Sequence, residues 1–141
     1  MAWWVYAFIS AAAAAATAIL AKIGMQGVSS TLATALRTCV VLAFAWSMVF
    51  IAGEQQGIRD LKTRSLVYLG LSGAATGISW LAYFKALHMA PASRVAPVDK
   101  ISLALTIVLA AVVLGETITW KVGVGAALIV AGALLTLSPD A

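Results

Sequence analysis

The chain has 141 residues, of which 63% are hydrophobic and only 10% are charged, and its mean hydropathy is +1.04. A soluble domain of this length needs far more polar surface, so the composition excludes that class and indicates a protein that crosses a membrane several times. The net charge is +4, and because the cations are scattered singly we interpret it as loop topology rather than nucleic-acid binding.

Five apolar segments follow one another, each close to the ~20 residues that a transmembrane helix requires. They are predicted at residues 3–23, 31–52, 65–88, 94–115 and 118–137. Short connections separate them, so successive helices are expected to be antiparallel neighbours. The predicted fold is therefore an all-α membrane protein, a single domain of five transmembrane helices over residues 1–141.

The connections contain helix-capping signals. Ser29 and Ser30 precede the second segment, where serine side chains can cap a helix. Ser93 is the predicted N-cap of the fourth helix, which would put Pro97 in the first turn, where a proline forfeits no helical hydrogen bond. The first segment opens with Trp3, typical of an interfacial aromatic belt, and lacks the basic stretch of a secretory signal, so a retained helix is expected.

The loop cations predict the orientation. With five spans, the N-terminus shares a membrane face with Arg59, Lys62, Arg64 and Lys121. The opposite face has Arg94 alone, or five cations if those deep in the segments are added. The positive-inside rule therefore favours a cytoplasmic N-terminus, but the bias is small and insertion in both orientations stays open.

Four charged residues lie within the apolar segments: Arg37, Lys85, Asp99 and Lys100. Such a charge costs roughly 2.5–3.5 kcal/mol even on a lenient insertion scale, so each needs a partner or a water-filled cavity. The helical rise puts Arg37 and Asp99 about 10 Å below the same membrane face. We therefore expect a shared cavity in one half of the bilayer, although Lys85 and Lys22 could instead reach the interface with their long stems.

Two polar stripes support a hydrated path. One consists of Asp99, Ser102 and Thr106, and the other of Ser72, Thr76, Ser79 and Tyr83, each at helical spacing. Hydrogen bonding between helices explains the hydroxyl groups equally well. Trp80, which is deeper than a belt aromatic, could wall the cavity or simply pack.

One carboxylate among three cations leaves a surplus of positive charge, which favours an anionic or zwitterionic ligand. Arg37 and Lys100 would hold its negative group, while Asp99 would orient them or couple a proton. The predicted substrate-binding residues are Arg37, Lys85, Asp99, Lys100, Ser102, Ser79 and Tyr83. A purely structural alternative is an ion pair between Arg37 and Asp99 that joins the second and fourth helices.

Several classes of site are not expected. The chain has no nucleophile–base pair and no His/Cys/Asp/Glu cluster with metal-ligand spacing, so we predict neither an enzyme nor a metal or cofactor. Its single cysteine, Cys39, excludes an internal disulfide. Gly73 and Gly77 form a GxxxG pattern, and Gly123 begins a second small-residue stripe, both typical of closely packed membrane helices.

Three segments carry a family resemblance. They read ALHMAPASRVAP at 86–97, LGETIT at 114–119 and GAALIVAG at 125–132. Together they resemble the signature of the EamA family, within the drug/metabolite transporter superfamily. Many members have ten helices in two five-helix repeats of opposite orientation, and this chain is similar to the short bacterial and archaeal members with one repeat. Residues 98–102 depart from the long members.

The resemblance implies a secondary transporter, an exporter working by alternating access in a prokaryotic cytoplasmic membrane. Inverted repeats place the substrate site at their interface, so a single repeat would need a second chain, and we expect an antiparallel homodimer. The alternative is a non-transporting membrane subunit that binds a lipid headgroup or a partner protein.

Overall fold

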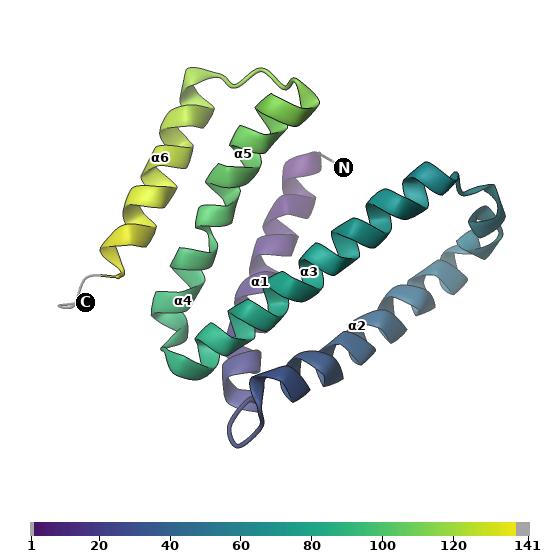
Figure 1. Ribbon diagram of the computed structural model, residues 1–141, viewed down its shortest axis with the longest axis horizontal. Coiled ribbons are helices and arrows are strands. Elements are labelled where there is room, and N and C mark those ends of the chain that lie inside the picture. Colours follow the sequence, from purple (N-terminus) through teal and green to yellow (C-terminus); the bar gives the residue numbers. More distant parts are fainter. Residues whose placement is uncertain (1, 138–141) are drawn as a thin grey trace. The chain divides into compact units, whose positions relative to one another are not determined.

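The computed structural model describes residues 2–137, and its regular structure there is entirely helical. The elements are α1 (Trp3–Gly24), α2 (Ser30–Ala52), the short 3₁₀ helix η1 (Glu54–Asp60), α3 (Thr63–Met89), α4 (Ala92–Asp99), α5 (Ile101–Leu114) and α6 (Trp120–Leu135) (Figure 1). The all-helical prediction is thereby confirmed for the described residues. Residues 1 and 138–141 of the predicted domain lie outside them.

Within residues 2–137, four stretches are long and apolar enough to cross a membrane, namely Trp3–Gly24, Ser30–Ala52, Thr63–Met89 and Ala92–Leu114. The last helix, α6, has 16 residues. It therefore covers about 24 Å at the helical rise, less than the ~30 Å of a hydrocarbon core. The count of five spans stays a prediction.

The predicted fourth helix corresponds to α4 and α5, which are separated at Lys100 alone and together form one candidate span, Ala92–Leu114. Its N-cap is Pro91, whose extended backbone (φ −61°, ψ 145°) precedes α4 and whose carbonyl accepts from the Val95 N–H at 3.1 Å. The prediction of Ser93 as N-cap is therefore wrong. Pro97 lies well inside α4 rather than in its first turn, so the Ser93 carbonyl lacks its helical N–H partner.

Other helix ends follow the capping signals. The Ser29 hydroxyl accepts a hydrogen bond from the Leu32 N–H at 3.3 Å, which confirms the predicted cap of α2. Gly53 and Gly115, with φ of 72° and 70°, end α2 and α5 in the left-handed conformation that glycine adopts without strain.

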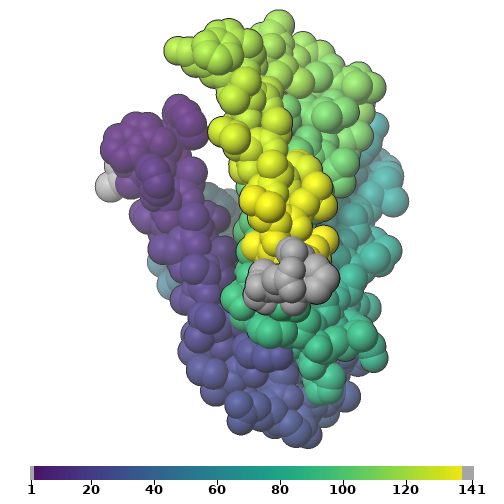
Figure 2. Space-filling view, turned by 90° about the vertical axis from the view of Figure 1, so that its left-hand side faces the viewer, coloured from purple at the N-terminus to yellow at the C-terminus, as the bar shows by residue number. Residues whose placement is uncertain are grey.

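The chain divides into two compact units, and each is considered by itself. The first comprises Met1–Ile19 and Met89–Ala141, as far as these residues are described, and the second comprises Leu20–His88. Within the first unit, α6 packs on α5 and α4, and Figure 2 shows α6 in yellow beside the green α5. Within the second, η1 links α2 to α3 (Figure 1).

Candidate functional site

Arg37 of α2 lies against two aromatic rings of α3. Its Cζ is 4.2 Å from the centroid of the Trp80 ring and 5.4 Å from that of the Phe84 ring. Arg37 and Trp80 are half-buried, and Phe84 is only 2% exposed. A guanidinium this close to an aromatic face is attracted by the quadrupole of the ring. We call Trp80 and Phe84 the aromatic cradle.

The cradle results from helical spacing. Trp80 and Phe84 are four residues apart and so share one face of α3. Neither α2 nor α3 contains an Asp or Glu, so aromatic faces, not a carboxylate of these helices, meet the charge of Arg37. Because the guanidinium carries five N–H donors in its plane, contact through its face leaves its edges able to bind an anion.

Tyr83, Ser79 and Lys85 lie on α3 near the cradle but differ in exposure. Tyr83 is half-buried, and its ring meets that of Phe84 edge to face at a centroid distance of 6.1 Å. Ser79 and Lys85 are exposed. Lys85 is about 140° around the helix from Trp80, so it does not share the face that carries Arg37.

In the other unit, Asp99 and Lys100 form an ion pair at the junction of α4 and α5. The Lys100 Nζ is 3.3 Å from the Asp99 Oδ2, and the side chains are 49% and 34% exposed, respectively. Ser102 is exposed in the first turn of α5. The predicted residues thus fall into two groups, one in each unit. The single cavity and the Arg37–Asp99 ion pair both stay predictions.

The threonines of the two polar stripes bond to their own helices. The Thr106 hydroxyl donates to the Ser102 carbonyl at 2.8 Å, and the Thr76 hydroxyl donates to the Ser72 carbonyl at 2.9 Å. These bonds satisfy the hydroxyl hydrogens without a second helix. The threonines alone are therefore weak evidence for a hydrated path.

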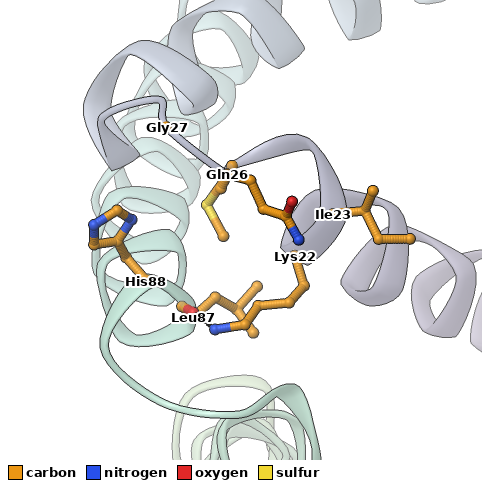
Figure 3. A pocket seen from close by; sticks show the side chains of 7 residues that line it. Lys22, Ile23, Gln26, Gly27, Leu87 and His88 are labelled. Atoms are coloured by element: carbon orange, nitrogen blue, oxygen red, sulfur yellow. Dashed lines mark hydrogen bonds between the residues drawn. The ribbon is translucent and has the colours of Figure 1, made fainter.

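A pocket of about 230 Å³ opens where α1 and α3 end, and the sequence reasoning missed it. Its lining residues are Lys22, Ile23, Met25, Gln26, Gly27, Leu87 and His88 (Figure 3). The Lys22 ammonium donates to the backbone carbonyl of Leu87, one of the last carbonyls of α3, which have no partner within the helix. The sequence did contain one indication of this pocket. The five predicted spans place the first and third connections on the same membrane face, and Lys22 and His88 lie beside these connections.

Comparison with known proteins identifies relatives along almost the whole chain. The sequence profile of the EamA-like transporter family matches residues 1–138. A Sinorhizobium protein described as an uncharacterized transporter in cobO 3'region is 43% identical over 133 residues, which are 94% of this chain and 94% of that protein. No solved structure matches.

Proposed function

Since this chain belongs to the EamA-like transporter family, we propose that it exports a small anionic or zwitterionic metabolite by alternating access, as a homodimer. Family membership establishes that the protein is an integral membrane transporter. It therefore lies among lipids and has a small-molecule substrate. Transporters of this family are not enzymes. The substrate class, the direction and the dimer are the proposed part.

The observation that carries the proposal is the position of Arg37 on the aromatic cradle. The guanidinium lies within an apolar helix, 4.2 Å from the Trp80 centroid. Burying a cation is favourable only where partners compensate its lost hydration. The rings supply part of that compensation, and a bound carboxylate or phosphate at the edge of the guanidinium would supply the rest.

The junction of α4 and α5 supports a transport site with the same charge preference. Transporters commonly bind substrate at discontinuous helices, where the N-terminus of a half-helix faces an anionic group. Here α5 starts at Ile101, directly after Asp99 and Lys100. Lys100 would exchange its carboxylate partner for the substrate, and Asp99, once released, would be free to take up a proton.

The proposed substrate-binding residues are Arg37, Lys85, Asp99, Lys100, Ser102, Ser79 and Tyr83. Arg37 and Lys100 would hold the negative group, and the hydroxyl groups would add neutral hydrogen bonds. Lys85, which faces away from the cradle, would act at the edge of the cavity.

Small residues support assembly with a second chain. A Cβ atom added at Gly73, Gly77 or Gly123 would meet nothing within 4 Å. Because close helix association in lipid depends on such smooth surfaces, these positions can receive a partner helix. A second copy in the opposite orientation would complete the pair of inverted repeats through which alternating access operates.

A stabilisation screen of the purified protein in detergent tests the site. Amino acids, carboxylic acids, phosphorylated metabolites and organic cations would be added to the wild type, Arg37→Ala and Asp99→Asn. A ligand at about 100 to 1,000 times its Kd should stabilise the wild type by about 3–4 kcal/mol, readable as a shift in Tm. Arg37→Ala should stay folded and lose this shift. Arg59→Ala, which removes a loop cation, should keep it.

Stabilisation by organic cations alone, or a full shift in Arg37→Ala, would contradict the proposed site. The ligand found would then be loaded into proteoliposomes, where Arg37→Ala should abolish its transport. Tightly retained lipid together with silence across the soluble panel would favour the alternative, a non-transporting subunit that binds a lipid headgroup or a partner protein.

A further inference from the structure

We propose that the pocket at the ends of α1 and α3 binds the phosphate group of a phospholipid headgroup. It shares no lining residue with the aromatic cradle or with the proposed substrate residues. The site would therefore be an additional one, on a transporter whose cargo binds elsewhere.

Two of the residues that line the pocket are buried. Met25 and Leu87 are 4% and 0% exposed. The connection from α1 to α2 is held by two backbone hydrogen bonds, from the Met25 N–H to the Ala21 carbonyl at 3.0 Å and from the Val28 N–H to the Met25 carbonyl at 3.1 Å. Gly27 makes the turn with φ +76°, a conformation that other residues rarely adopt. The turn that carries Met25, Gln26 and Gly27 is thus held by the backbone.

The polar lining suits an oxyanion. Lys22, Gln26 and His88 all carry N–H donors. Figure 3 shows the Lys22 ammonium at Leu87, the Gln26 amide beside the Lys22 side chain, and the His88 ring pointing away from both. Among the described residues, neither an Asp nor a Glu lines this pocket. Phosphate oxygens only accept hydrogen bonds and gain further from a cationic donor. Lys22 also meets the electronegative end of α3 at the Leu87 carbonyl, which lessens the repulsion of an anion by that helix end.

The position of the pocket points to a lipid as the source of the phosphate. Both α1 and α3 are candidate membrane spans, so their ends lie at the level of the headgroups. Ile23, Met25 and Leu87 add apolar surface beside the donors, and basic pockets between membrane helices recognise headgroups in this way. At about 230 Å³, the volume is below the roughly 300–1,000 Å³ of pockets for drug-sized ligands, as expected for a headgroup fragment.

The test measures lipid binding to the full-length, delipidated protein in detergent by native mass spectrometry. The probes are dioleoyl phosphatidylglycerol, dioleoyl glycerol, which lacks the phosphate, and soluble glycerol phosphate. Gln26→Glu places a negative charge in the pocket without removing the Lys22 bond to Leu87. Gln56→Glu makes the same change in η1 and serves as the control.

We expect the wild type and Gln56→Glu to bind the phosphatidylglycerol alike, and Gln26→Glu to bind it about fivefold more weakly, the effect of one charge near a membrane surface. Lys22→Gln should weaken binding similarly and Lys62→Gln should not. If Lys22→Gln fails to fold, the comparison of Gln26→Glu with Gln56→Glu decides alone. Equal binding by Gln26→Glu and Gln56→Glu overturns the site. Binding of dioleoyl glycerol as tight as that of the phospholipid overturns the phosphate assignment, and equally tight glycerol phosphate overturns the lipid source.

Discussion

Arg37 shows how a membrane helix can carry a charge that no carboxylate of α2 or α3 neutralises. A cation–π contact is worth up to about 2 kcal/mol when it is shielded from water. An arginine in the middle of a helix costs roughly 2.5–3.5 kcal/mol on the lenient insertion scale. The contact with Trp80 at 4.2 Å therefore offsets much of the cost but leaves a remainder. A bound anion at the proposed substrate site would remove that remainder, as would Asp99 in the structural ion pair predicted from the sequence.

Trp80 should act as a positioning residue for Arg37. Trp80→Leu removes the ring face and should weaken binding of the ligand found in the screen by about tenfold, whereas Trp80→Phe should cost less because a smaller face remains. Ligand titrations followed by Tm measure both. Trp46→Leu is the control, since Trp46 contacts Phe50 within α2 at a centroid distance of 5.9 Å. Equal losses in Trp46→Leu and Trp80→Leu would show that the effect is general destabilisation.

At the scale of the elements, the helical hydrogen bonding is interrupted near the junction of α4 and α5. Pro97 removes one helical hydrogen bond from α4. Two residues later α4 ends, and the Lys100 N–H bonds to the Pro97 carbonyl at 3.0 Å, three residues back rather than four. A helix interrupted at a pair of charged residues is a natural place for bending during alternating access.

Pro97→Ala should make α4 more stable and transport slower. Alanine supplies the missing N–H to the Ser93 carbonyl, so the free energy of unfolding should rise by about 1–2 kcal/mol, after the greater freedom of the unfolded chain is allowed for. Pro91→Ala, at the N-cap outside the helix, should neither raise the free energy of unfolding nor slow transport. Thermal unfolding in detergent and transport in proteoliposomes separate the two effects. A more stable Pro97→Ala protein with unchanged transport would contradict the proposal that transport requires bending at the junction of α4 and α5.

At the scale of the whole molecule, the helices expose much of their apolar surface. In α5, for example, Val112 and Val113 are 77% and 71% exposed. In a membrane, lipid or a second chain covers such surface without the hydrophobic cost it would carry in water. In the proposed homodimer, the second chain would approach at the small-residue positions on α3 and α6, and the weak charge bias of the loops allows that chain to be inverted.

Dual orientation can be tested with two single cysteines in a Cys39→Ser background. Gln56→Cys and Ser93→Cys flank α3, one candidate span, so they must lie on opposite faces of the membrane. For an antiparallel homodimer, an impermeant maleimide added to cells should label about half of the molecules at each site. Complete labelling at one site and none at the other would show a single orientation and contradict the antiparallel dimer.

Local signals were enough to predict the helical segments and the Ser29 cap, because hydropathy and capping depend on residues close in sequence. They misplaced the start of the fourth helix. The side chain of Ser93 is a common helix cap, but the backbone of Pro91 already provides the extended N-cap conformation. Local composition also predicted that Arg37 needs a partner, but it did not identify the aromatic rings of α3 as that partner.

The amino-acid sequence by itself determined the class of protein, an integral membrane protein of helices, and its family, since both depend on composition and on motifs along the chain. Only the tertiary structure decided that Arg37 lies on Trp80 and that Lys22 reaches the Leu87 carbonyl. Periodicity defines the faces of each helix, but which faces meet depends on packing between residues far apart in the chain. The candidate substrate site and the headgroup pocket both depend on such meetings.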